Sequence, residues 1–309
     1  MRKEAVLRRI MLFWTLFIGI GAVAGATGMF AQPDGSTLGM QEMLPYFQVL
    51  PFAEMLYQNY IFPGIALLLI NGMTNLTAAW LIFRRKPAGA WLGCIFGVTL
   101  MLWITIQFVI FPANFMSTIY FVFGAIQFLC GVAYIISVKQ SQFQFDAGGY
   151  TGIGVNPDIL VVYYSRLGYT RKIAYEKAAE LGAEIYEITT PERTAGFFGF
   201  LWLGRYGMHK RAMPVNSVPF DITRYQKVIL VTPVHVFSVA APVRGFLEAC
   251  RGKIREAEYI GVHFRGDSDF LGIFDEMDQI LDIQGSKWES IVCKFGRVRR
   301  RRRRETGTE

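Results

Sequence analysis

The first half of the chain alternates long uncharged stretches with short polar ones. Four stretches of 21 to 24 residues contain no charged residue: 10–30, 62–83, 88–111 and 115–138. As helices rising about 1.5 Å per residue, all four could cross a hydrocarbon core of about 30 Å. The pattern therefore predicts a four-helix transmembrane bundle within residues 1–138.

Basic residues set the expected orientation of these helices. Four of them lie among the first nine residues and three more form 84–86, whereas the connections 31–60 and 112–114 contain none. The positive-inside rule then places both termini, and everything after residue 138, in the cytoplasm of a multi-pass plasma-membrane protein. The basic start and Ala-x-Ala steps of the first stretch also fit a cleaved signal peptide. Its long apolar run favours an uncleaved helix.

Amides stand inside the second and fourth stretches. Asn71, Thr74 and Asn75 share one helix face, and Gln127 lies in the fourth stretch. Such groups need partners in hydrocarbon, so they either bond to one another across the bundle or line a pocket for a quinone-like head group. The stretches contain no ionisable Asp, Glu, Lys, Arg or His, which disfavours a proton relay.

A polar, glycine-rich stretch, 139–157, predicts a flexible linker. Beyond it, short apolar runs alternate with amphipathic helical segments, the pattern of a doubly wound α/β domain over 158–296. The runs predict a parallel sheet of five strands: 158–164, 184–188, 227–232, 259–264 and 288–294. The helices are expected at 171–181, 197–211, 242–251 and 268–281.

Composition argues against several classes of partner and site. The chain is 52% hydrophobic, and the 18 basic and 18 acidic residues of 139–296 cancel, which argues against nucleic acid as a partner. The four cysteines stand far apart, so neither a disulfide scaffold nor a zinc site is predicted. We assign no metal ligand and no catalytic residue, and nothing supports a hydrolase.

The loop after the first predicted strand is a candidate anion site. Ser165 to Thr170 reads SRLGYT and leads into the first predicted helix of this domain. Two hydroxyl side chains and one glycine at a helix N-terminus offer convergent donors and a positive dipole end. The sequence has neither a dinucleotide fingerprint nor a nucleoside-triphosphate loop here.

Two segments resemble the flavodoxin family. YYSRLGYTRKIA (163–174) is similar to its phosphate loop, and YQKVILVTPVHVFSVAAPVRGFLE (225–248) to its third strand and the following loop. The resemblance covers about 158–296. It implies a flavodoxin-like sheet of order 2-1-3-4-5 with FMN bound between the first and third strands.

The resemblance also implies three groups of cofactor-binding residues. The phosphate loop would supply Ser165, Arg166, Leu167, Gly168, Tyr169 and Thr170; the second loop Pro233, Val234, His235, Val236 and Phe237; and the third Arg265, Gly266 and Asp267. Leu167 replaces a hydroxyl residue of the family pattern, which removes one phosphate donor. His235 stands where the family often has an aromatic residue, and a cationic ring there would raise the flavin potential. Asp267 also fits the N-cap of the helix predicted from Ser268.

The end of the chain departs from the family. No amphipathic segment for the family's closing helix follows Gly296, because an arginine-rich tail, 297–309, begins there. The sheet face left bare is expected to meet the linker, the membrane helices or a second subunit of a homo-oligomer. The tail could bind the anionic lipid surface. Segment 196–211, aromatic and then basic, could rest in the membrane interface, although packing on the sheet is the simpler use.

These features predict a membrane-anchored, FMN-binding flavodoxin-like electron-transfer protein or small reductase. It would act at the cytoplasmic face with a redox partner protein or a quinone-like molecule. Whether it is an enzyme, such as an FMN-dependent oxidoreductase, stays open. The alternatives are a flavin-free docking or regulatory module of a membrane protein, and a quinone or porphyrinogen oxidoreductase.

Overall fold

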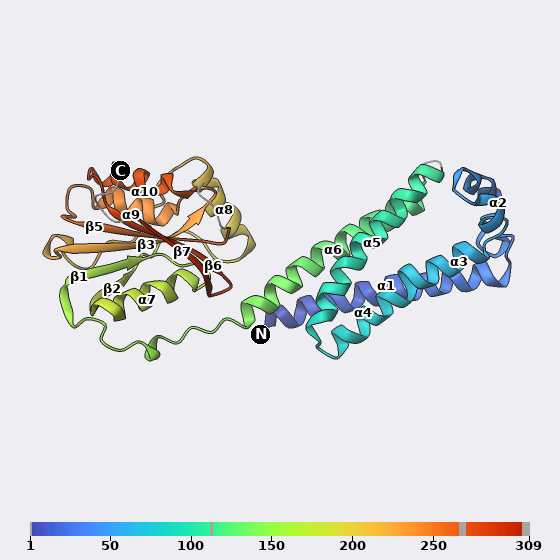
Figure 1. Ribbon diagram of the computed structural model, residues 1–309, viewed down its shortest axis with the longest axis horizontal. Helices are drawn as coiled ribbons and strands as arrows, with labels where there is room; N and C mark the ends of the chain where they lie inside the picture. Colours follow the sequence, from blue (N-terminus) through green and yellow to red (C-terminus); the bar gives the residue numbers. More distant parts are fainter. Residues whose placement is uncertain (1, 112–113, 266–269, 305–309) are drawn as a thin grey trace. The chain divides into compact units, whose positions relative to one another are not determined.

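The computed structural model describes residues 2–111, 114–265 and 270–304 (Figure 1). The chain divides into two compact units, Met1–Gln142 and Phe143–Glu309, and each is described by itself.

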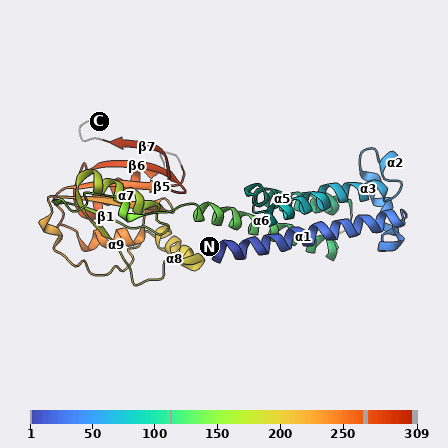
Figure 2. The ribbon, with the colours of Figure 1, turned by 90° about the horizontal axis from the view of Figure 1, so that it is seen from below.

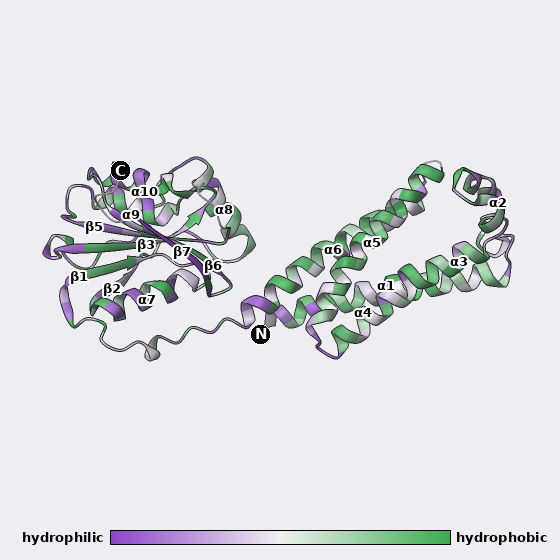
Figure 3. Cartoon of the chain, in the orientation of Figure 1, coloured by the Kyte–Doolittle hydropathy of each residue, from purple (hydrophilic) through white to green (hydrophobic). Residues whose placement is uncertain are grey.

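Within its described residues, the first unit contains four helices that are long and apolar enough to cross a membrane: Lys3–Ala31, Ile61–Phe83, Pro87–Ile110 and Phe115–Ser141. This confirms the four predicted stretches to within a few residues. The first, third and fourth correspond to α1 (Arg2–Ala31), α5 (Pro87–Ile110) and α6 (Phe115–Ser141). Apolar residues dominate all of them (Figure 3).

The second long helix is irregular. It consists of α3 (Ile61–Leu67), the π-helix η3 (Leu68–Met73) and α4 (Thr74–Phe83). Short elements connect it to α1: η1 (Ser36–Leu38), η2 (Gln41–Val49) and α2 (Ala53–Leu56). A π-turn inserts an extra residue into the helix, and such turns often mark functional or strained positions.

Glycines and amides hold this unit together. A Cβ at Gly97 of α5 would stand 2.6 Å from the backbone nitrogen of Phe128 in α6, so only glycine allows this approach. The Gln127 amide nitrogen donates to Asn75 Oδ1 at 2.8 Å and to the Gly93 carbonyl at 2.9 Å. Asn75 and Gln127 therefore bond across helices, as one of the two interpretations expected, whereas the buried Asn71 side-chain amide has no hydrogen-bond partner among the described residues.

The second unit is a mainly parallel α/β sheet. Its strands are β1 (Asn156–Tyr163), β2 (Ala183–Glu187), β3 (Lys227–His235), β4 (Ser238–Val239), β5 (Ala257–His263), β6 (Lys287–Lys294) and β7 (Arg297–Arg304). The main path is β2-β1-β3-β5-β6-β7. The first five strands of this path are parallel, which is the predicted flavodoxin-like order 2-1-3-4-5 once β4 is set aside.

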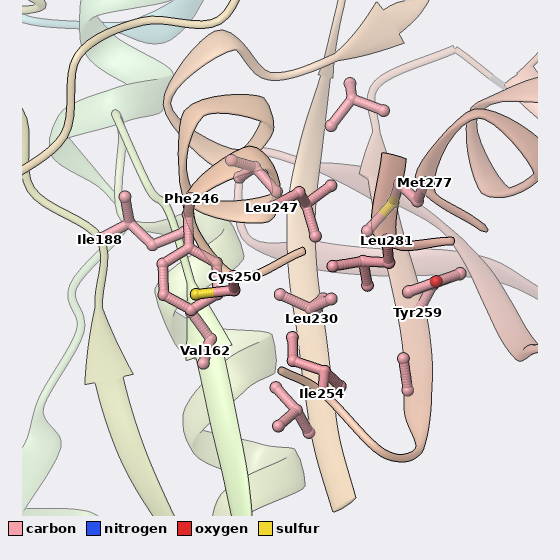
Figure 4. Close-up of a cluster of buried hydrophobic side chains, with 14 of the residues drawn as sticks. Val162, Ile188, Leu230, Phe246, Leu247, Cys250, Ile254, Tyr259, Met277 and Leu281 are labelled. Atoms are coloured by element: carbon pink, nitrogen blue, oxygen red, sulfur yellow. The ribbon is translucent and has the colours of Figure 1, made fainter. Parts of the chain in front are cut away.

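Helices cover both faces of the sheet (Figure 1). They are α7 (Tyr169–Leu181), α8 (Gly196–Met208), α9 (Ala241–Ala249) and α10 (Gly272–Leu281), with short turns η4 (Ala147–Gly149) and η5 (Ile222–Arg224). Ile173 and Ala178 of α7 pack on one face. Phe246 and Leu247 of α9 and Met277 of α10 pack on the other, in one cluster with Leu230 of β3 (Figure 4).

The prediction of a five-stranded, all-parallel sheet was incomplete. The two-residue strand β4 pairs antiparallel with β3, and β7 pairs antiparallel with β6 beyond the parallel strands (Figure 2). β7 is built from the arginine-rich segment, which the sequence presents as a tail without an apolar face. Edge pairing needs only backbone groups, and Arg301 and Arg303 reach the carboxylate of Glu289, which is buried within β6.

Residues of the predicted linker contact the sheet unit. Phe143 lies against Tyr169, with ring centroids 4.8 Å apart, and Ile153 packs on the cluster beneath α7. A Cβ at Gly296, just before β7, would meet the Phe143 ring at 2.1 Å. The segment therefore supplies part of the cover expected for this face, and its flexibility stays a prediction.

Candidate functional site

The loop that follows β1, the ends of β3 and β5 and the residues just after these ends line one cavity of about 340 Å³. It lies at the carboxyl ends of these strands, where sheets of this order bind ligands. Residues predicted for the cofactor line it: Ser165, Arg166, Leu167, Tyr169, Thr170, Pro233, Val234, His235 and Val236. Loops separated by more than sixty residues of sequence therefore meet as the family resemblance implied.

The β1–α7 loop presents the N-terminus of α7 to this cavity. Gly168, the N-cap, has φ +87°, and its N–H donates to Ser165 Oγ at 3.1 Å. That bond closes the loop, while helix geometry leaves the next N–H groups, from Tyr169 onward, without intrahelical acceptors. Thr170 is buried in the first turn. The loop thus offers free N–H groups and a positive dipole end to an anion.

Arg166 ties this loop to the beginning of α8. Its Nε donates to the Thr194 carbonyl at 3.1 Å and its Nη2 to the Gly196 carbonyl at 2.6 Å. The guanidinium also stands 5.3 Å from the ring centre of Phe200. Arg166 therefore adds positive charge to the cavity wall while its side chain is held by α8.

The second loop is a strained two-residue turn. His235 pairs with Ser238 across the β3–β4 hairpin, and between them Val236 and Phe237 have φ values of +49° and +58°. A turn with two positive φ angles suits Asn-Gly, and a β-branched residue in that region is an outlier. Strain of this kind persists only when the surrounding structure imposes it, often at ligand sites.

His235 is neutral at physiological pH. Burial, followed by the nearby Arg166 charge, lowers the pKa of its imidazole from 6.5 to about 4. The Nδ1 atom is buried without a hydrogen-bond partner among the described residues. The cationic imidazole considered from the sequence is therefore disfavoured.

The third loop contributes different residues from those predicted. Gly266 and Asp267, with the expected helix start at Ser268, lie outside the described residues. Arg265 is not among the residues lining the cavity, and its carbonyl bonds to His263 Nδ1. His263 and Phe264 do line the cavity. Phe237 also points elsewhere, because it stacks on Phe270 with ring centroids 5.5 Å apart.

The sequence did not indicate that α8 forms a cavity wall. Phe200, Leu203 and Gly204 of this helix line the cavity, with Cys293 of β6. In the sequence, the apolar residues of α8 are equally consistent with packing in the core. Only the fold shows that some of them line the cavity. The four-residue spacing of Gly199, Leu203 and Gly207 was the feature of the sequence that could have indicated which side of α8 is buried.

The residues present fit a phosphorylated aromatic ligand. One end of the cavity has a helix N-terminus and hydroxyl groups, and the remainder is lined mainly by apolar side chains, together with His235 and His263. Its volume is within the usual range of about 300–1,000 Å³ for small-molecule sites. Leu167 supplies no hydroxyl, so backbone N–H groups, Ser165 and Thr170 are the donors available to a phosphate.

Among solved structures, the chain is similar to a flavoprotein from Lactobacillus acidophilus in complex with FMN. That likeness has 18% identity and a TM-score of 0.36, and it covers 40% of this chain and 86% of the other. The apo form of the flavoprotein from the same organism matches with 17% identity and a TM-score of 0.31, over 42% of this chain and 91% of that one. No model of a known protein family and no curated protein matches the chain.

Proposed function

We propose that this chain is a membrane-anchored flavodoxin-like protein that binds FMN and transfers electrons, as a carrier or small reductase, at the cytoplasmic face. One observation carries the proposal: the β1–α7 loop and the ends of β3 and β5 line the same cavity beside the α7 N-terminus. The strand order reverses direction between β1 and β3 at this point, where doubly wound sheets bind cofactors.

Each wall of the cavity has a definite role in this proposal. The N–H groups of the α7 N-terminus, with Ser165 and Thr170, would hold the phosphate. Val234, His235 and Phe264 would position the ring system and exclude water from it. When bound, FMN supplies the electron transfer itself. The neutral imidazole of His235 adds no positive charge next to the ring.

The membrane location rests on the four apolar helices and on charge. Basic residues at 84–86 connect the second and third helices, while the connection 31–60 contains none. The positive-inside rule supports a cytoplasmic α/β unit. Electrons would then pass between a cytosolic donor and a partner protein or quinone-like molecule at the bilayer. A homo-oligomer is compatible with the same arrangement.

The visible spectrum of the detergent-purified full chain tests FMN binding. We expect a flavin absorbance band and release of FMN on denaturation. A preparation that stays colourless after FMN is added contradicts the proposal. It would favour the flavin-free docking module, for which the missing hydroxyl at Leu167 is the supporting observation.

A gain-of-function variant makes the test specific to the phosphate loop. Leu167→Thr restores the hydroxyl of the family pattern at a cavity-lining position. A hydrogen bond to a charged group contributes about 1.5–3 kcal/mol, so FMN should bind roughly tenfold more tightly or better. Val155→Thr, at an exposed position outside the cavity, is the matched control and should leave the affinity unchanged. Equal affinities of the two variants would show that this loop does not hold the phosphate.

A further inference from the structure

The helix α8 buries a narrow seam and exposes most of its large side chains. Gly199, Leu203 and Gly207, four residues apart, are buried. The exposed apolar side chains are Phe197, Phe198, Phe200, Leu201, Trp202 and Met208. A helix on the surface of a soluble domain normally turns polar residues outward, whereas α8 turns large apolar residues outward.

The buried seam holds α8 through the Leu203 side chain, which packs with Met213 and Ala241, and through close backbone contacts. A Cβ at Gly199 would stand 2.3 Å from the Thr194 carbonyl carbon, and one at Gly207 would stand 3.0 Å from the His235 carbonyl oxygen. Gly207 therefore lets the helix lie close to the end of β3, and Gly199 lets it lie close to the segment that precedes it. Its outward aromatic residues are not needed for this packing, since Phe197 and Phe198 remain 67% and 71% exposed.

Basic residues surround the aromatic face. Arg193, Arg205 and Arg211 are exposed, and Glu192 is the single acidic residue between positions 191 and 211. Glu192 accepts a hydrogen bond from the Trp202 indole at 2.8 Å, and the Arg205 guanidinium stands 5.4 Å from the Trp202 ring centre. Aromatic side chains beside exposed arginines form the composition that anionic lipid interfaces attract.

We propose that α8 is an interfacial membrane helix, with Phe197, Phe198 and Leu201 inserted at the acyl boundary of an anionic bilayer. The exposed arginines would lie at the level of the lipid head groups. Charge complementarity selects lipid as the occupant, because a second copy of α8 would bring the same arginines together. The proposal rests on the proposed membrane insertion of the same chain, but it does not require FMN.

This docking would place the cavity beside the bilayer surface. Phe200, Leu203 and Gly204 line the cavity from the same helix, and Arg166 is bonded to its first residue. A lipid-soluble redox partner could then reach the cavity along α8 without crossing bulk water. The α8 face would therefore select a membrane-dissolved partner over a water-soluble one.

Spin-label accessibility tests the docking in the full chain. A nitroxide is attached at Phe198→Cys, and in a second sample at Glu180→Cys on the exposed side of α7, with one chain per nanodisc of about 3:1 phosphatidylcholine to phosphatidylglycerol. Parent protein without an introduced cysteine gives the background, and Cys250 and Cys293 are buried. We expect the label at 198 to collide several-fold more with oxygen than with a water-soluble nickel chelate. The label at 180 should show the reverse.

A second pair of variants tests whether contact with lipid is the reason that the nickel chelate does not reach the label at 198. Phe197→Glu with Leu201→Glu should make the label at 198 accessible to nickel, whereas Val155→Glu, at a position 77% exposed, should not. Nickel access at 198 equal to that at 180 overturns the proposal, and so does low access to both reagents, which indicates protein cover. If the chain does not enter the discs, the proposed membrane insertion is wrong. This outcome can be distinguished from the two results that overturn only the docking of α8.

Discussion

The partly buried imidazole of His235, whose Nδ1 atom is covered, should make the fold sensitive to mild acid. Its pKa is about 4 in the folded chain and about 6.5 when unfolded. Between these values the unfolded chain binds more protons, so the free energy of unfolding falls as the pH falls. Above about pH 7.5 both states are neutral and His235 contributes no pH dependence.

The magnitude follows from the two pKa values. Lowering the pH from about 8 to about 5 should reduce the free energy of unfolding by about 2 kcal/mol through His235 alone. Other groups titrate in the same interval. Burial also lowers the pKa of His263, although its bond to the Arg265 carbonyl opposes this. A single-site comparison is therefore required.

His235→Gln provides that comparison. Denaturant unfolding of both full-length proteins in detergent, at matched ligand occupancy and at the two pH values, gives four free energies. The wild type should lose about 2 kcal/mol more than the variant on acidification, because only the wild type has the buried imidazole. An equal loss in both proteins would refute the buried, neutral state of His235.

Three further changes test other parts of the structure. Arg301→Ala should lower the free energy of unfolding by about 1 kcal/mol, because Arg301 pairs with the buried Glu289 but is itself 43% exposed. In a Glu289→Gln background, the same substitution should lower the free energy of unfolding by less. Val236→Asn should raise it by about 1 kcal/mol, because asparagine tolerates the positive φ, and denaturant unfolding in detergent measures both effects. Gln127→Leu should lower the thermal midpoint in detergent, since Asn75 Oδ1 loses its donor at a cost of about 1–2 kcal/mol, and an unchanged midpoint would contradict the cross-helix bond.

The sequence predicted the strands best where the hydrophobic pattern of a segment directly reflects its burial in the sheet. Strands such as β1 and β3 are continuous apolar runs because both of their faces are covered, and their ends adjoin polar or glycine-containing loops. The candidate loop at 165–170 follows directly from the end of β1, whereas β3 is longer than predicted and includes 233–235. Parallel strand order could be inferred only from the family resemblance, because hydrophobic pattern does not encode which strands are neighbours.

The remaining features depend on long-range contacts. β7 has a single apolar residue, Val298, and its pairing is set by the free edge of β6 rather than by its own pattern. The neutral state of His235 depends on burial and on the charge of Arg166, which lies about seventy residues earlier. The wall formed by α8 was missed because exposed and buried aromatic residues look alike in one sequence.

Polar contacts connect the cavity walls to one another, in addition to the apolar packing of α8 and α9. Arg166 joins the β1–α7 loop to α8. Arg244, buried in α9, donates to Ser238 Oγ at 3.2 Å and pairs with Glu276 of α10 at 2.6 Å, which holds the strand after the strained turn. Lys210, just beyond α8, reaches the same Glu276 carboxylate at 3.5 Å. One carboxylate thus links α8, α9 and the β3–β4 hairpin, so a ligand or bilayer that displaces α8 would act on the turn that presents His235.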